Sequence, residues 1–187
     1  MANGKVGTMA TPRAGHTTHV LEYDGGLFTR EISARRDIKV FSDTLSRFNG
    51  TKPWALTLIP LPAGMDYEQV LKAKIETTEY VQAGGSADAM TVQIRKPGGN
   101  GSDQGVESVW YVVGHPGGGG SALDVAIPLP NSVEMISRTE VFGAAEAAEL
   151  FFAYYQHGDI PSGYALRSIN GWTAGGIRVD LRERASQ

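Results

Sequence analysis

The sequence predicts an α+β fold in a single domain: a mainly antiparallel sheet with two principal helices packed on it. Runs of β-forming residues follow one another along the chain, and the linkers between several of them are short and rich in glycine. Such linkers hold no crossover helix, so the strands that they join are expected to be antiparallel. Only two segments have clear helical periodicity, and they stand between groups of strands. A doubly wound parallel sheet, in which a helix follows each strand, is therefore not expected.

The first elements of the predicted domain are a hairpin and a helix. Apolar-alternating runs at residues 19–22 and 27–32 flank Asp24-Gly25-Gly26, a turn sequence typical of hairpins. Residues 37–48 repeat apolar side chains at spacings of three, four and three, namely Ile38, Phe41, Leu45 and Phe48. This spacing predicts a helix with one buried face.

The segment over residues 66–81 has no decisive periodicity. A short helix over residues 66–74 is one interpretation, and residues 75–81 resemble a strand more than a helix. The side chains that such a helix would turn inward are those of Tyr67, Val70 and Leu71. The pattern leaves this segment open.

The remaining strands and the second helix are clearer. Runs rich in β-forming residues predict strands at 54–59, 89–95, 107–113, 123–129, 164–169 and 177–181. The second helix is expected over residues 143–156, with a buried stripe formed by Ala144, Ala148, Phe151 or Phe152, and Tyr155. Gly158 is expected to end this helix, and Pro161 prevents it from resuming.

Composition excludes several classes of protein. The chain has 187 residues, 41% of them hydrophobic, which is enough apolar material for a sizeable core. Its net charge of −3 lacks the basic excess of a general nucleic-acid binder. Cysteine is absent, so disulfides, thiolate metal sites and cysteine nucleophiles are excluded. No apolar run is long enough for a membrane-spanning helix, and the N-terminus lacks a secretory signal, so we expect a cytoplasmic protein.

The chain is expected to divide into a tail and one domain. Residues 1–15 are small and polar without periodicity, which predicts a flexible N-terminal tail. Residues 16–187 then form the single α+β domain. The 24 glycines gather in clusters between the apolar runs, where they predict turns and loops.

The most unusual segment is a glycine-rich linker that follows the strand predicted at 107–113. It consists of Gly114, His115, Pro116, Gly117, Gly118, Gly119, Gly120 and Ser121. It lacks the lysine and the following helix of a phosphate-binding loop. One interpretation is a plain hairpin tip. The other is a thin loop that enters the cleft of another protein, where side chains would clash.

The second interpretation needs anchors beside the linker. Fixing the backbone costs roughly 1–2 kcal/mol per residue, so glycines alone would bind weakly. The candidate anchors on the neighbouring predicted strands are Arg95, Lys96 and Trp110. Together with the linker, they form the candidate partner-binding residues.

No catalytic, metal or cofactor site is predicted. His16 and His19 form an HxxH pair, but the residues around them predict a strand, which points side chains three apart to opposite faces. Glu146 and Glu149 are expected to lie on the solvated face of the second helix. The sequence therefore predicts a protein that is not an enzyme.

Residues 141–167, VFGAAEAAELFFAYYQHGDIPSGYALR, carry a recognisable pattern. A helix rich in alanine, glutamate and aromatic residues ends in a Tyr-x-x-Gly-x-x-Pro turn, and a strand follows. This pattern resembles the carboxyl-terminal signature of bacterial immunity proteins of polymorphic toxin systems. It is most similar to the first-numbered immunity family, whose turn reads Phe-x-x-Thr-Gly-x-x-Pro. The chain departs from that family at His157-Gly158 and in continuing through Gly171-Trp172 to Gln187.

A second similarity is to the immunity factor for tuberculosis necrotizing toxin. It rests on the size, the α+β order and the glycine-rich linker. The first resemblance implies that the cognate toxin is a nucleic-acid deaminase, and the second implies an NAD-degrading glycohydrolase. The residues do not separate these two.

The resemblances imply an immunity protein, or antitoxin, that acts in the cytosol. Such a protein forms a 1:1 complex with its cognate protein toxin and occludes the active site, with no nucleic-acid or membrane partner. Two alternatives belong to other classes: a secretion chaperone or adaptor for a bacterial effector, and a small ligand-binding or hydrolytic enzyme that uses His115 and Ser121.

Overall fold

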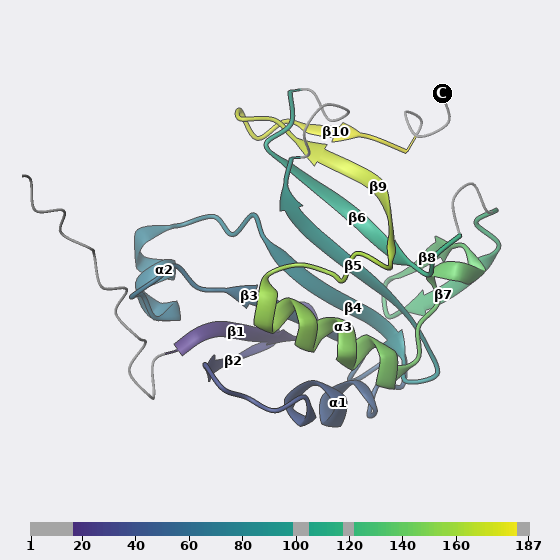
Figure 1. Cartoon of the computed structure of the whole chain (residues 1–187), viewed down its shortest axis with the longest axis horizontal. Coiled ribbons are helices and arrows are strands. Elements are labelled where there is room, and N and C mark those ends of the chain that lie inside the picture. The colour runs from purple at the N-terminus through teal and green to yellow at the C-terminus, as the bar shows by residue number, and fades with distance from the viewer. Residues whose placement is uncertain (1–16, 99–104, 118–121, 183–187) are drawn as a thin grey trace, which may run out of the picture.

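An eight-stranded antiparallel sheet organises the chain, as Figure 1 shows. The structure, a computed structural model, describes residues 17–98, 105–117 and 122–182. From edge to edge the strands are β10 (Arg178–Asp180), β9 (Ala165–Trp172), β6 (Ser108–Gly114), β5 (Ala89–Pro97), β4 (Tyr80–Ser86), β3 (Ala55–Pro60), β1 (Thr17–Tyr23) and β2 (Phe28–Ser33). The predicted α+β class with a mainly antiparallel sheet is confirmed.

A smaller hairpin and several helices complete the structure. The hairpin pairs β7 (Val125–Leu129) with β8 (Ser132–Ile136), and it is separate from the large sheet. The helices are α1 (Lys39–Leu45), α2 (Tyr67–Ala73), the 3-10 helix η1 (Arg138–Glu140) and α3 (Ala144–His157). Figure 1 shows α1 and α3 in front of the sheet, with α2 and the hairpin at opposite ends of its central strands.

We call the surface of the sheet under α1 and α3 the helix face. Because successive strand residues point to opposite faces, every second residue of each strand contributes to it. Its buried core combines strand residues such as Leu21, Val92 and Ile94 with Phe41 of α1 and Phe151 of α3. Here the two helices and the sheet bury their apolar stripes together.

We call the other surface the polar face. Glu22, Thr57, Gln82 and Gln93 are directly paired across four neighbouring strands on this face. The side chain of Gln82 donates a hydrogen bond of 2.7 Å to that of Gln93. α2 covers one end of the face, where the Tyr67 hydroxyl donates to Glu22, and the β7–β8 hairpin packs on the other.

Both predicted helices are present. The apolar spacing in residues 37–48 is confirmed, since Phe41, Leu45 and Phe48 are buried and Ile38 packs against the core, although α1 itself is shorter. In α3 the outcome is more mixed. Its buried side chains are Ala147, Ala148, Leu150, Phe151 and Tyr154, so Tyr154 is fully buried where Tyr155 was expected.

The stop of α3 is as predicted. Gly158 has φ of +73°, the left-handed conformation that glycine adopts without a steric penalty, and its N–H donates to the carbonyl of Tyr154. The chain then turns back, and β9 runs beside β6.

The open segment over residues 66–81 is resolved as a short helix and a late strand. Asp66 caps α2 in a capping box with Gln69, and Val70 is buried. The inward orientation expected for Leu71 is wrong, because its side chain is 59% exposed. One residue further along a helix turns the side chain by about 100°, away from the buried stripe. The strand begins only at Tyr80.

The hairpin-tip interpretation of the glycine-rich linker is wrong. The strands on either side of the linker, β6 and β7, lie in different sheets, because β6 pairs with β5 and β9 while β7 pairs with β8. The linker therefore carries the chain from the large sheet to the separate hairpin.

Candidate functional site

The residues predicted to bind a partner lie in separate places. Gly114 ends β6, and the chain continues through His115 to Gly117 at the edge of the described segment. Gly118, Gly119, Gly120 and Ser121 lie outside the described residues. Arg95, Lys96 and Trp110 lie on β5 and β6, away from the linker.

Strand geometry explains the separation. Trp110 precedes His115 by five residues on β6, which spans about 16 Å in an extended strand. The two residues also point to opposite faces: Trp110 packs with the β7–β8 hairpin on the polar face, whereas His115 stacks on Phe142 in the helix-face core. The structure does not bring the predicted anchors to the linker.

Lys96 lies apart from both Trp110 and the linker. It follows Arg95 directly and therefore points to the opposite face of the sheet. Its ammonium group donates to both carboxylate oxygens of Asp159, at 2.9 and 2.8 Å, just beyond the end of α3. Lys96 thus ties β5 to the turn after α3.

His115 is held firmly at the start of the linker. Its backbone N–H donates to the carbonyl of Thr139, and Nδ1 lies 2.8 Å from the same oxygen. Nε2 lies 3.0 Å from the carboxylate of Glu146 on α3. Both partners are acceptors, so only the doubly protonated ring satisfies both contacts.

The electrostatics agree with this geometry. Burial lowers the pKa of His115, but hydrogen bonds to Glu146 and Thr139 and the charge of Glu146 outweigh it, so the pKa is raised overall. Burial, a hydrogen bond to Glu146 and nearby carboxylates raise the pKa of Tyr164 to about 12. The expectation that Glu146 is simply solvated is wrong, since it binds both His115 and Tyr164.

Arg95 is the centre of a second cluster, on the polar face. It is directly opposite Tyr80 on β4 and Trp110 on β6. Its Nε and Nη2 donate to the Ser108 hydroxyl at 3.1 and 2.9 Å. Its guanidinium carbon lies 4.0 Å from the centroid of the Trp172 ring. We call Arg95, Tyr80, Ser108, Trp110 and Trp172 the Arg95 site.

Tyr80 and Trp110 of the Arg95 site are both partly buried. Burial raises the pKa of Tyr80, although the charge and hydrogen bond of Arg95 act in the opposite direction. The indole Nε1 of Trp110 and the side-chain oxygen of its cross-strand neighbour Asn170 are buried without a hydrogen-bond partner among the described residues. A donor and an acceptor thus lie unsatisfied on adjacent strands, which native structures rarely tolerate.

A groove leads from α2 to the Arg95 site. It has a volume of about 410 Å³, and its floor includes Glu22, Thr57 and Tyr80. Its wall carries Leu71 and Ile75, which are 59% and 42% exposed. Tyr80 lines the groove and contacts Arg95, so an apolar wall, an aromatic ring and a cation follow one another along the polar face.

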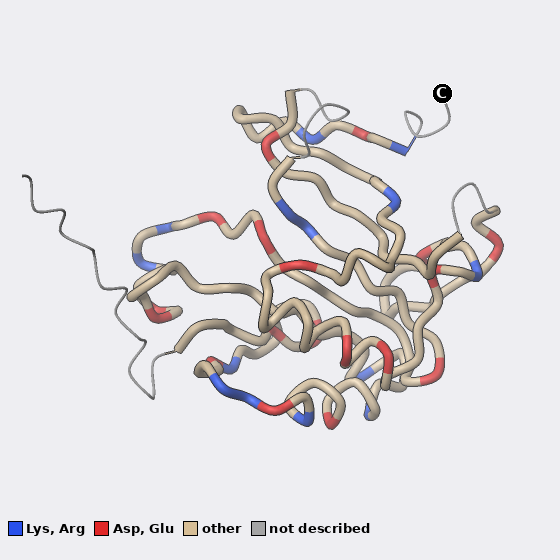
Figure 2. Tube along the Cα trace, viewed as in Figure 1, with Lys and Arg blue, Asp and Glu red and all other residues tan. Residues whose placement is uncertain are grey.

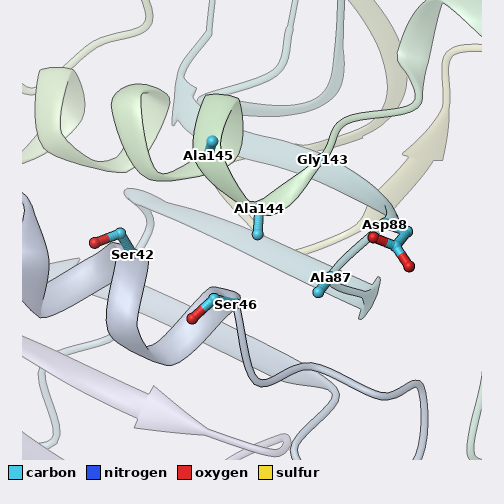
Figure 3. A pocket seen from close by; sticks show the side chains of 7 residues that line it. All are labelled: Ser42, Ser46, Ala87, Asp88, Gly143, Ala144 and Ala145. Atoms are coloured by element: carbon cyan, nitrogen blue, oxygen red, sulfur yellow. The ribbon is translucent and has the colours of Figure 1, made fainter.

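A larger hollow lies where α1 and the start of α3 meet the β4–β5 turn. Figure 3 shows Ser42 on α1 and Ser46 just after its end across from Ala144, with Asp88 on the turn. The hollow measures about 570 Å³. The described residues that line it include two hydroxyls and one carboxylate but no histidine or cation, so we assign it no chemistry.

The HxxH pair is described only in part. His16 lies outside the described residues. His19 packs against the ring of Tyr155, and burial lowers its pKa to about 4. Within the described segments, no group of three or more potential metal ligands was found. None of the described helices is long and apolar enough to cross a membrane.

Sequence reasoning identified two members of the Arg95 site and missed the others. Arg95 and Trp110 were candidates, whereas Tyr80, Ser108 and Trp172 were not. These three lie on different strands, and no local spacing connects them. Only the order of the strands, with β9 beside β6, brings Trp172 to Arg95.

A scan of protein-family models and searches of curated proteins and of solved structures found no match for this chain.

Proposed function

We propose that this protein is an immunity protein that binds a cognate protein toxin in the cytosol and occludes its active site. Residues 141–167 carry the resemblance that suggests this function, with an NAD glycohydrolase or a nucleic-acid deaminase as the toxin. The structural observation that supports it best is the Arg95 site.

The residue types of the Arg95 site are those that dominate protein–protein binding. Arginine, tryptophan and tyrosine are enriched among the few interface residues whose removal costs most of the affinity. Here Arg95, Trp172 and Tyr80 lie together on neighbouring strands, and the groove beside them offers exposed Leu71 and Ile75. The arrangement therefore combines a cationic anchor with an apolar contact.

The Arg95 site is also held ready for binding. Ser108 and Trp172 fix the guanidinium of Arg95 in the unbound protein, so little side-chain freedom remains to be lost in a complex. The strands beneath it are central in the sheet. Because Arg95 remains partly exposed, a carboxylate of the toxin can form a charge-assisted hydrogen bond with it.

Co-expression with the toxin encoded beside this gene tests the proposal. We expect the parent chain to restore growth and Arg95→Ala to lose protection. Lys72→Ala is the matched control, because it removes a cation from an exposed pair on α2 that is outside the Arg95 site. Arg95→Ala that keeps its melting temperature and protects like the parent would contradict the proposed site.

The activity of the toxin in the complex tests the mode of action. Occlusion predicts that purified toxin loses its activity when this protein is added. A stable complex in which the toxin stays active would contradict immunity and favour a secretion chaperone.

The linker remains a separate prediction. If Gly114 to Ser121 enters the toxin's cleft, replacing Gly118 and Gly119 with valine should abolish inhibition without lowering the melting temperature. Unchanged inhibition by that variant would remove the linker from the interface.

A further inference from the structure

A row of cations lies along the β2 edge of the sheet and on α1 beside it. Figure 2 shows blue segments on α1 and on the connection that leads into it. We call these residues the basic edge: Arg30, Arg35, Arg36, Lys39 and Arg47. All of these side chains are exposed, and none forms an ion pair or a side-chain hydrogen bond within the described part of the chain.

The basic edge is concentrated in space. Arg30, Lys39 and Arg47 line one hollow of about 340 Å³, together with the single carboxylate of Asp43. Two further carboxylates lie nearby: Asp37 accepts a hydrogen bond from the backbone of Lys39, and Glu31 on β2 accepts one from the backbone N–H of Tyr67. In a chain whose net charge is −3, cations outnumber carboxylates here.

The backbone of this region is fixed. The Tyr155 hydroxyl on α3 accepts a hydrogen bond from the Arg36 N–H and donates one to the Ser33 carbonyl. Between these two residues, Arg35 has φ of +73°, a left-handed conformation that side-chain-bearing residues rarely adopt. Asp24 and Lys74 also have positive φ, and the strain at Arg35 is of the kind that glycine would relieve.

The adjacent strand is open to pairing. Among the described strands β2 is the last of the sheet and pairs with β1 alone, so its outer backbone N–H and C=O groups face away from the sheet. Arg30 is paired with Leu21, which belongs to the helix-face core, so Arg30 points to the α1 side. A strand added to β2 would place every second side chain beside the basic edge.

We propose that β2 binds an extended acidic polypeptide segment of a partner by strand addition, with the basic edge pairing its carboxylates. Charge complementarity selects the acidic segment, and the strand edge favours a polypeptide because only a polypeptide continues the backbone hydrogen bonds. This surface is distinct from the Arg95 site, and the inference does not depend on the immunity function.

The probe that tests this inference is a fluorescent decapeptide of alternating glutamate and threonine, with an alternating lysine and threonine peptide for comparison. We expect anisotropy to report binding of the acidic peptide only. The double variant Arg30→Glu/Arg47→Glu should weaken that binding about tenfold or more. Arg138→Glu/Arg178→Glu makes the same change in net charge on η1 and β10, away from β2, and it should bind like the parent.

Hydrogen exchange separates strand addition from attraction by charge alone. Strand addition predicts that the peptide protects backbone amides in residues 28–33. Binding without this protection would overturn the inference, as would equal affinity of the two double variants. Tighter binding of a single-stranded oligonucleotide than of the acidic peptide would also overturn it.

Arg35→Gly tests one residue of the basic edge with a substitution that is not expected to destabilise the protein. Glycine adopts positive φ without strain, so we expect the melting temperature to hold or rise while peptide binding weakens. A fall in the melting temperature with unchanged binding would show that Arg35 serves the fold and would contradict its place in the basic edge.

Discussion

The two faces of the sheet differ in what fills them. On the helix face, apolar side chains from strands and helices exclude water, and the buried rings of Phe41 and Phe151 lie 5.8 Å apart. On the polar face, a row of polar residues crosses the central strands, and Gln93 is only 4% exposed. Its hydrogen bond with Gln82 satisfies a group that burial would otherwise penalise.

The difference teaches which face holds the fold and which offers recognition. Apolar residues of about the right size suffice to fill the helix face. A polar side chain that is buried against a sheet needs hydrogen-bond partners in fixed positions. Partners of this kind also hold Arg95, whose guanidinium donates to the Ser108 hydroxyl. We therefore expect substitutions in the buried helix-face core to act on stability and substitutions in the Arg95 site on the polar face to act on toxin binding.

The largest effect is expected from Phe41→Ala on the helix face. Phe41 is fully buried between α1 and α3, and deleting a buried phenylalanine ring costs roughly 3–5 kcal/mol. Urea unfolding measures this loss. Phe28→Ala, which changes a ring that is 52% exposed, is the control. Equal losses in the two variants would contradict a helix-face core around Phe41.

A similar effect is expected from acid through His19, which lies on the helix face beside Tyr155. Burial lowers its pKa to about 4 in the folded protein, below the ordinary value. The unfolded chain therefore binds the proton first, so this stability is complete above about pH 6.5 and is lost as the pH falls toward 4. The loss is roughly 3 kcal/mol. Unfolding of the parent and His19→Asn from pH 7.5 to 4 checks it, since the variant should lack this component of the pH dependence.

A smaller loss of stability is expected at Gly158, which ends α3 on the helix face. In Gly158→Val the new Cβ meets no atom within 4 Å, so we expect the cost to come from the left-handed backbone. This cost is about 1–2 kcal/mol. Gly163→Val, which also has open space but no positive φ, should melt like the parent. Identical melting of both variants would show that the cap at Gly158 is unimportant.

The smallest stability effect is expected where the polar face is made apolar. Replacing both members of a buried hydrogen-bonded pair is nearly neutral when the new side chains fill the same space. Gln82→Leu/Gln93→Leu should therefore change the free energy of unfolding by no more than about 1 kcal/mol. A loss as large as that of Phe41→Ala would show that the polar face holds the fold and would remove the contrast between the faces.

Sequence reasoning succeeds where the signal is local. The spacing from Ile38 to Phe48 records one buried helix face, and the glycine at 158 marks the end of α3 through its backbone conformation. The Arg95 site leaves no such record, because it unites side chains from β4, β5, β6 and β9. The site forms because β9 pairs with β6 although the β7–β8 hairpin lies between them in the sequence. A local stretch of sequence does not reveal this pairing.

Calorimetric titration of the purified toxin into this protein and into Arg95→Ala tests the central claim most directly. If the Arg95 site anchors the partner, the variant should keep the parent's melting temperature and lose affinity about 30-fold or more, which corresponds to about 2 kcal/mol. An unchanged affinity of a stable Arg95→Ala variant would contradict the claim that the polar face is the binding face.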